Sequence, residues 1–317
     1  MKHIWQSSAV QLIVVITLNQ IQCQHFNYID IKIYKSNRTI LVSFADEINH
    51  ETEATEISIE GQNLTTLKEG TFNDLLQLKI LKIQDCGLED IQDGTFNNLP
   101  NLQVLNLNHN VLRTIHRDTF KDLSITRLYL ACNAIESFEK DAFHDIKYLE
   151  VLDLSQNRLK NLHSHMFKGT TFLRQVNFSF NKLERIPHEC FLHGFVNIIT
   201  GQDSYIDLSD NLLTYLNEKS LEGIYNIKNL YLQNNVLEQI NSNVFDAISY
   251  IEDVNFENNN LTTLSNSILN HLKSTKYVRL SGNPWNCNFV KKFDQWCKNN
   301  NKTNTLEYYV IDECNSS

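Results

Sequence analysis

Residues 149–167 read LEVLDLSQNRLKNLHSHMF, and this stretch decides the fold. With Leu149 as position 1, apolar residues occupy positions 1, 4, 6, 11 and 14, Asn157 stands at position 9 and Phe167 at position 19. The alternation around positions 4 and 6 is typical of a strand with one buried face. A single strand of this kind cannot bury its apolar side alone, so the pattern predicts that similar units stack on one another.

The same template recurs ten times along the chain. Position 1 falls at Ala54, Leu78, Leu102, Ile125, Leu149, Leu173, Asp203, Ile227, Ile251 and Thr275, with spacings of 24, 24, 23, 24, 24, 30, 24, 24 and 24 residues. Position 9 is Asn in every unit except the first two, which carry Gln62 and Cys86. An Asn amide can satisfy backbone groups that are buried where the chain turns away from the strand. Position 19 is Phe or Leu, and we expect this column to fill the outer half of the core.

This pattern resembles the leucine-rich repeat family in its 24-residue extracellular form. The resemblance implies an α/β fold: a curved solenoid, or horseshoe, with a parallel β-sheet on the concave face and an irregular or short-helical convex side. The expected parts are a signal peptide (1–23), an N-terminal cap (24–53), about ten repeat strands (54–283) and a cysteine-containing C-terminal cap (284–317). About six extra residues around 196–202 are interpreted as a surface bulge or as a loop that contacts a partner.

Both ends of the array carry segments that differ from the repeats. Residues 28–34 (YIDIKIY) and 39–44 (TILVSF) predict a strand pair in the N-terminal cap. Residues 283–287 (NPWNC) resemble the C-terminal flanking cap of extracellular leucine-rich repeat proteins, with a helix at 289–298 lying on the last repeat. Cys287, Cys297 and Cys314 allow three pairings, of which we favour Cys287–Cys314 over Cys287–Cys297.

The N-terminal residues predict export. Lys2 is followed by an apolar run at 9–18, which is too short to span a bilayer and is typical of a secretory signal. No second long apolar run follows, so we expect a secreted, extracellular chain without a transmembrane anchor. Six glycosylation sequons agree with this compartment, at Asn37, Asn63, Asn177, Asn260, Asn301 and Asn315.

Composition argues against several classes of function. The formal net charge is −9 without a basic cluster, which disfavours nucleic acid as a partner. There is no nucleophile elbow or Gly-rich phosphate loop, so we expect no enzyme activity and no cofactor. The histidines at 163, 165, 188 and 193 lack the spacing of a metal site. Unpaired cysteines leave a disulfide-linked dimer open, through Cys132, Cys297 or Cys314, beside a non-covalent one.

The open face of the predicted sheet carries two groups of candidate ligand-binding residues at positions 3, 5 and 7. The first group is Ile80, Val104, Arg127, Tyr129 and Val151, with Asp153 next to it. The second group is Tyr205, Asp207, Tyr231, Asp253 and Glu257. Tyr and Arg are enriched at binding hot spots, and the curved surface favours a protein or a large glycan over a small metabolite.

The sequence therefore predicts a secreted, glycosylated binding protein that acts by non-covalent recognition. It is similar to insect secreted leucine-rich immune proteins that lack a coiled coil, which implies innate immune recognition of an extracellular protein or glycan. The alternatives are a scaffold in the extracellular matrix or in cell adhesion, and a non-catalytic subunit of an enzyme complex.

Overall fold

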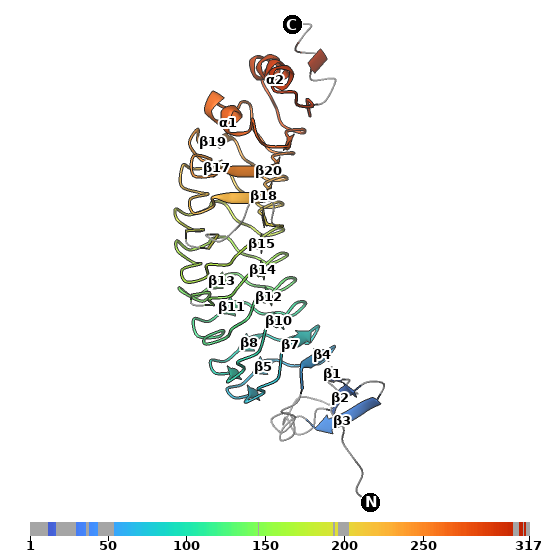
Figure 1. Ribbon diagram of the computed structural model, residues 1–317. Helices are drawn as coiled ribbons and strands as arrows, with labels where there is room; N and C mark the ends of the chain where they lie inside the picture. The colour runs from blue at the N-terminus through green and yellow to red at the C-terminus, as the bar shows by residue number, and fades with distance from the viewer. Residues whose placement is uncertain are drawn as a thin grey trace, which may run out of the picture.

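The computed structural model describes residues 12–16, 30–35, 38–43, 54–144, 146–192, 194–195, 203–306, 311–312 and 314. Its main element is a ten-stranded parallel sheet whose strands follow one another in chain order (Figure 1). The strands are β4 (Glu56–Glu60), β7 (Ile80–Gln84), β10 (Val104–Asn106), β12 (Arg127–Tyr129), β14 (Val151–Asp153), β15 (Gln175–Asn177), β16 (Tyr205–Asp207), β18 (Asn226–Tyr231), β20 (Tyr250–Asn255) and β21 (Tyr277–Arg279). Each repeat contributes one strand, which confirms the predicted solenoid.

The register of the sheet follows the repeat. Leu105, Leu128 and Leu152, all at position 4, lie opposite one another on consecutive strands. These side chains have no exposed surface. A slip of one residue would turn each of these side chains to the open face, so burial fixes the register.

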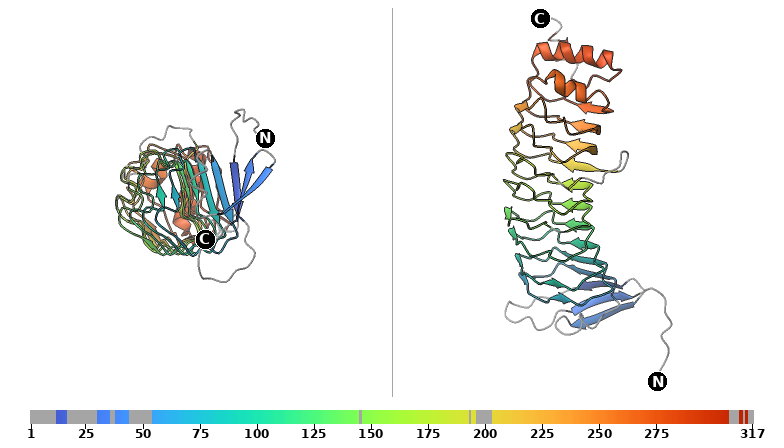
Figure 2. Two further views of the ribbon diagram at one scale, coloured as in Figure 1. Left: turned by 90° about the horizontal axis from the view of Figure 1, so that it is seen from below. Right: turned by 60° about the vertical axis from the view of Figure 1, so that its left-hand side comes forward.

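The outer side of the solenoid consists of turns and very short strands. These strands are β5 (Thr66–Leu67), β6 (Phe72–Asn73), β8 (Asp90–Ile91), β9 (Phe96–Asn97), β11 (Thr114–Ile115), β13 (Ser137–Phe138), β17 (Tyr215–Leu216) and β19 (Gln239–Ile240). They lie opposite the long sheet, as the right-hand view of Figure 2 shows. The irregular convex side expected from the resemblance is therefore present.

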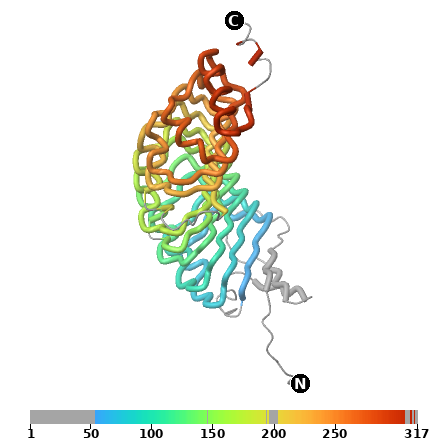
Figure 3. The backbone as a smooth tube through the Cα atoms, turned by 45° about the horizontal axis from the view of Figure 1, so that its top comes forward, coloured from blue at the N-terminus to red at the C-terminus, as the bar shows by residue number. Residues whose placement is uncertain are grey.

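The position-19 column fills the outer half of the core, as predicted. Phe72 stacks on Phe96 with ring centroids 6.0 Å apart, and Phe167 stacks on Phe191 at 6.1 Å. Neighbouring strands in a sheet are about 4.8 Å apart. Because the aromatic layer has the larger repeat distance, the stack must bend toward the sheet, and the sheet becomes the concave face. The tube in Figure 3 follows these stacked coils.

Buried Asn side chains at position 9 connect each coil to the one before it. Asn157 donates to the carbonyls of Leu130 and Leu154 at 2.9 and 3.1 Å, and its Oδ1 accepts the N–H of Ile135 at 2.9 Å. Leu130 and Ile135 belong to the preceding repeat, so a single side chain satisfies backbone groups in two coils. The same pattern recurs at Asn181, Asn211, Asn235, Asn259 and Asn283.

The chain also turns in the same way at position 8 of every repeat. All ten residues there have a positive φ, between 53° and 71°. They are Gly61, Asp85, His109, Cys132, Gln156, Phe180, Asp210, Asn234, Asn258 and Gly282. Gly adopts this left-handed conformation readily, and Asn, Asp and His are enriched in it, whereas a bulky side chain adopts it at a cost. Cys132, Gln156 and Phe180 are thus the exceptions in an otherwise well-suited column.

A helical cap closes the C-terminal end of the stack. Helix α1 (Asn266–His271) belongs to the last full repeat, and α2 (Cys287–Asn299) begins after Asn286, whose side chain accepts the N–H of Phe289. Phe289, Phe293 and Trp296 are buried, and the Trp296 indole donates to the carbonyl of Leu269 at 3.1 Å. The favoured disulfide, Cys287–Cys314, is present with Cα atoms 5.0 Å apart.

At the other end, three strands form an antiparallel sheet. The predicted strand pair is present as β2 (Asp30–Lys35) and β3 (Arg38–Ser43). β1 (Leu12–Ile16), which falls inside the expected signal peptide, pairs with β2 and lies next to β4. The rest of residues 1–53 and the extra residues at 196–202 lie outside the described residues. None of the described helices is long and apolar enough to cross a membrane.

The ladder leads to a direct prediction about stability. Asn157→Ala leaves the Ile135 N–H buried without a partner, and it removes one of the two side-chain donors from the Leu130 and Leu154 carbonyls, which still accept from Asn133 and Asn181. A buried unsatisfied group costs about 1–3 kcal/mol and each lost hydrogen bond about 1 kcal/mol, so we expect a loss of about 3–5 kcal/mol in unfolding free energy, measured by urea denaturation. Asn161→Ala, in the same repeat but at an exposed position, is the control and should change little. Equal effects of the two substitutions would contradict the role of the ladder.

Candidate recognition surface on the concave face

The concave face presents two rows of side chains, from positions 3 and 5 of the ten strands. In the position-5 row, the register places Tyr129, Asp153, Asn177, Asp207 and Tyr231 on consecutive strands β12 to β18. In the position-3 row, Arg127, Val151, Gln175 and Tyr205 follow one another in the same way. The two predicted groups of residues are therefore neighbours on one continuous surface.

The centre of this surface is a cluster of tyrosines and carboxylates. We call Tyr129, Asp153, Tyr205, Asp207 and Tyr231 the central cluster. All five are partly buried. Burial, and then the charges of Asp153 and Asp207 and the nearby Tyr129, together raise the pKa of Tyr205 to about 12. Residues from strands on both sides of β15 thus lie within electrostatic range of one another.

The carboxylates of the central cluster are not neutralised within the described part of the chain. Burial, and then the nearby Asp210 and Asp153, raise the pKa of Asp207, although hydrogen bonds from Ser209 lower it. Neither Asp153 nor Asp207 forms a salt bridge there. Toward the two ends of the sheet the situation differs, because Lys82 pairs with Glu56 at 2.7 Å and Arg279 pairs with Asp253 at 2.7 Å. The negative charge in the middle therefore remains available to a ligand.

Asp253 lies at the C-terminal margin of the cluster and is only partly compensated. Its Oδ2 accepts from the Arg279 guanidinium at 2.7 Å. Its Oδ1 is buried without a hydrogen-bond partner among the described residues. The residue is only 6% exposed, so it adds negative potential beside Tyr231 rather than contact area.

The apolar residues of the first predicted group differ in how much surface they offer. Arg127 is exposed, and Ile80 and Val104 are half-buried on adjacent strands. Val151 is only 6% exposed. Val151 therefore contributes little surface to a ligand.

Two of the predicted site residues also have a structural role that the sequence analysis missed. Asp153 Oδ1 accepts the N–H of Ser155 at 3.0 Å, and Asp207 Oδ1 accepts that of Ser209 at 2.9 Å. Asn177 makes the same bond to Ser179 at 2.9 Å. These bonds turn the backbone away from the strand, as Asn and Asp side chains often do. The recurrence of Asn or Asp two residues before position 7 was the signal that could have revealed this role.

The rim beside the central cluster carries Phe180, which the sequence analysis did not select. Its side chain is 57% exposed, and its φ is 54°. A bulky residue in this conformation is an outlier that costs on the order of 1–3 kcal/mol. Leu212 and Val236, at position 10 of the next two repeats, are 46% and 37% exposed. Phe180, Leu212 and Val236 form what we call the apolar rim.

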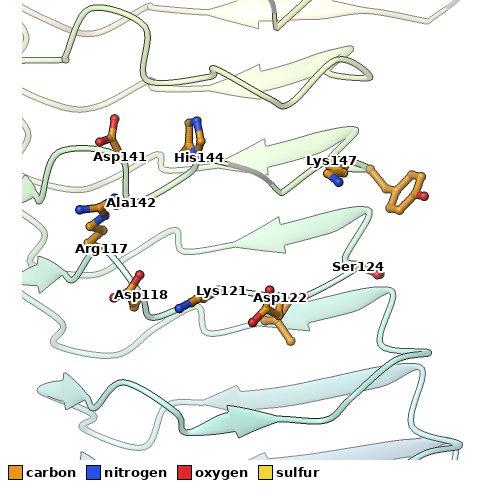
Figure 4. Close-up of a pocket in the computed structure, with 11 residues that line it drawn as sticks. Arg117, Asp118, Lys121, Asp122, Ser124, Asp141, Ala142, His144 and Lys147 are labelled. Carbon is orange, nitrogen blue, oxygen red and sulfur yellow. The ribbon is translucent and has the colours of Figure 1, made fainter.

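The convex side has shallow hollows with a different character. A hollow of about 590 Å³ opens between the outer turns of two adjacent repeats (Figure 4). Arg117, Asp118, Lys121, Asp122 and Lys147 are among the residues that line it. Because charges of both signs face the same space, this hollow does not select a ligand by charge. The gaps follow from the wider spacing of the coils on the outer side.

The cysteines and histidines bear on two further points of the sequence analysis, the disulfide-linked dimer and the metal site. Cys86, Cys190 and Cys297 are buried free thiols, and burial raises the pKa of Cys86 and of Cys297 to about 11. Among the free cysteines that the structure describes, Cys132 is the one that is partly exposed. His165 pairs with Glu189 at 2.9 Å, and His193 lies outside the described residues. The described residues contain no group of three or more His, Cys, Asp or Glu that could hold a metal.

The sequons fall on different surfaces. Asn63, Asn260 and Asn301 are exposed, whereas Asn177 is half-buried between Asp153 and Asp207 on the concave face. Asn37 and Asn315 lie outside the described residues.

Comparison with known families agrees with this geometry. A family model described as "Leucine rich repeat" matches residues 76–130 and 124–183, and one described as "BspA type Leucine rich repeat region (6 copies)" matches 195–303. The chain belongs to the leucine-rich repeat family. A search among curated proteins finds no match.

Solved structures show the same fold. A chain of the Drosophila Toll–Spatzle complex is 23% identical with a TM-score of 0.63, and covers 74% of this chain and 34% of its own length. A chain of the mouse RP105/MD-1 complex is 21% identical with a TM-score of 0.65, and covers 81% and 43%. A chain of the TLR13–ssRNA13 complex is 22% identical with a TM-score of 0.50, and covers 82% and 44%. This leucine-rich repeat chain thus spans less than half the length of these structures.

The charge of Asp207 should be visible in the pH dependence of stability. Its pKa is raised in the folded state, so the folded chain holds the proton more tightly than the unfolded chain. The stabilisation from this bound proton is fully present when the pH is below 3.8, the ordinary pKa of the group, and it is lost as the pH rises through the pKa of the folded state. We expect Asp207→Asn to unfold at a higher temperature than the wild type near pH 7, with the difference shrinking in acid.

The matched control for this measurement is Asp118→Asn, which removes an equal charge from an exposed position on the convex side. Calorimetry of the two variants separates the local effect from the general effect of net charge. A wild type that is more stable than Asp207→Asn near neutral pH would show that this carboxylate has a compensating partner.

Proposed function

We propose that this chain is an extracellular recognition protein that binds a protein ligand on the concave face of its repeat array. The observation that carries the proposal is the central cluster, in which Tyr129, Tyr205 and Tyr231 surround two unneutralised carboxylates on an open sheet. Tyrosine provides a large, rigid contact area with a polar tip and is enriched at binding hot spots. The curvature of the sheet suits a macromolecule better than a small metabolite.

The likeness to chains of the Toll–Spatzle and RP105/MD-1 complexes is consistent with a recognition role. Innate immune recognition is the role that we favour among extracellular ones, because the sequence also resembles insect secreted leucine-rich immune proteins. We propose no enzyme activity, since the cluster offers carboxylates and phenols without an adjacent nucleophile or base arranged for catalysis.

We also propose that the chain is secreted and glycosylated. Support comes from the apolar run after Lys2, the Cys287–Cys314 disulfide and the exposed sequons at Asn63 and Asn260. Neither of these two sequons lies in the position-3 or position-5 row of the concave face, so glycans there would leave the central cluster open. A glycan on Asn177 would cover it.

Mass spectrometry of the secreted protein tests this arrangement. We expect an N-terminus at Gln24, glycans on Asn63 and Asn260, and an unmodified Asn177. Peptide mapping with and without glycosidase gives the occupancy of each sequon. Full occupancy of Asn177 would rule out ligand binding at the central cluster, and a retained Met1 would rule out the signal peptide.

Site-specific photocrosslinking tests the concave face itself. With benzoylphenylalanine at Tyr129, we expect a discrete adduct with a protein from the extracellular fluid of the source organism. The same group at Tyr148, which is 53% exposed outside the concave face, is the control and should give none. Loss of the Tyr129 adduct on adding an excess of unlabelled wild-type chain shows that the site saturates. Adducts at Tyr148 alone would place recognition elsewhere.

A further inference from the structure

Three features of the concave face bear on the chemistry of its ligand. Among the described residues, the central cluster holds two carboxylates that no cation pairs with, and its margin holds a buried carboxylate oxygen without a hydrogen-bond partner. The apolar rim lies at the edge of the same surface. Features that share one surface restrict the ligand more than any one of them does alone.

The charge of the surface is the first restriction. Asp153 and Asp207 lie two strands apart with Asn177 between them, and Asp210 follows the strand β16, whereas Asp203 before this strand pairs with Lys228 at 3.5 Å. Two cations of the concave face, Lys82 and Arg279, pair with Glu56 and Asp253. The third, the exposed Arg127 on β12, lies at one margin of the central cluster and forms no ion pair with Asp153 or Asp207 among the described residues. A ligand phosphate or sulfate would be repelled here, whereas a ligand ammonium or guanidinium would gain charge-assisted hydrogen bonds.

The tyrosines provide the second restriction. Tyr129 and Tyr231 bracket the two aspartates in the position-5 row, and Tyr205 is their neighbour in the position-3 row. A cation above a tyrosine ring is attracted by the ring quadrupole, and Arg and Lys are the side chains that use this interaction. Carboxylates flanked by aromatic rings therefore suit basic side chains specifically.

The apolar rim provides the third restriction. Phe180 is held in a left-handed conformation at a position where Asn234 and Asn258 serve two other repeats. An exposed, conformationally costly phenylalanine beside a binding surface contributes nothing to the core. It offers apolar contact to a ligand that extends past the end of the strands.

From these observations we infer that the ligand presents a basic protein segment, with Lys or Arg side chains against Asp153 and Asp207 and an apolar side chain against Phe180. This inference rests on the proposed function and specifies the partner of the same surface. The segment lies across strands β12 to β18, at right angles to them, with its positive charges over the central cluster.

Binding of defined peptides tests the charge requirement. The probes are fluorescent peptides of about ten residues: alternating Lys and Leu, alternating Lys and Ser, and alternating Glu and Leu, together with a single-stranded RNA of similar length. Binding is measured by fluorescence anisotropy near physiological ionic strength, because the salt screens the long-range attraction of the peptides to the net charge of the chain. We expect the lysine peptides to bind and the glutamate peptide and the RNA not to bind.

The key comparison is between two double variants with equal net charge. The double variant Asp153→Asn/Asp207→Asn removes the two central carboxylates. Each new Asn keeps a side-chain oxygen that can accept the N–H of Ser155 or Ser209, just as the Asn177 oxygen accepts the N–H of Ser179. Asp118→Asn with Asp122→Asn removes two exposed carboxylates from the convex side. We expect the first variant to weaken lysine-peptide binding at least tenfold and the second to change it less than twofold.

The rim is tested with Phe180→Asn, which relieves the conformational cost, and with Phe172→Ala as control, since Phe172 is 46% exposed outside the concave face. We expect Phe180→Asn to weaken the Lys-Leu peptide severalfold, to leave the Lys-Ser peptide unchanged, and to leave the melting temperature equal or higher. Phe172→Ala should leave both peptides unchanged.

The outcomes separate this inference from the proposed function. Equal losses in the two aspartate variants, or binding of RNA as tight as that of the lysine peptides, would overturn the basic-segment inference. If photocrosslinking at Tyr129 still captures a partner in that case, recognition on the concave face stands and only the ligand class is wrong. If neither peptide binding nor crosslinking occurs at the concave face, both fail.

Discussion

The Asn side chain at position 9 is the interaction on which the rest of the structure depends. Every coil leaves its sheet at this point, and the backbone groups of the turn are buried between neighbouring coils. Asn157 shows the solution, because its amide bonds both its own coil and the preceding one. A buried backbone group without a partner costs about as much as a lost hydrogen bond, so the ladder decides that coils stack in register rather than slide.

Once the coils are in register, the difference in size between the two sides of each coil produces the curvature. Thin strands stack on one side and phenylalanine rings on the other, with ring centroids 6.0 to 6.3 Å apart. The curved sheet then presents the side chains of positions 3 and 5 toward a common space. The position of a residue in the repeat thus fixes whether it stabilises the core or faces a ligand.

The concave face also shows how a binding surface differs from the rest of the fold. Away from the centre of this face, charged side chains pair with neighbours along the stack, as Arg174 does with Glu150 and Lys82 with Glu56. At the centre, Asp153 and Asp207 have no such partner among the residues that the structure describes, and on the rim Phe180 occupies a conformation that suits Asn better. Natural proteins violate local rules of this kind mainly at functional sites, where the cost to stability is offset by binding.

The sequence by itself determined the repeat, the register and the residues that face inward, because a buried column with a fixed period leaves one arrangement that satisfies it. It also placed Tyr129, Asp153, Tyr205, Asp207 and Tyr231 on one face, since position 5 and position 3 follow from the period of the strand. It could not show that the two predicted groups form one surface, because their electrostatic contact spans several strands and depends on side-chain reach.

Only the tertiary structure decided how much of each side chain is available. Val151 and Asp253 share the repeat positions of exposed residues, yet each is only 6% exposed, and Asp253 pairs with Arg279. The structure also decided the cysteine pairing, because three cysteines in a cap allow several pairings until the helix α2 brings Cys287 close to Cys314. Period and polarity are properties of the chain, but burial and pairing are properties of neighbours that are distant in sequence, and these exist only after folding.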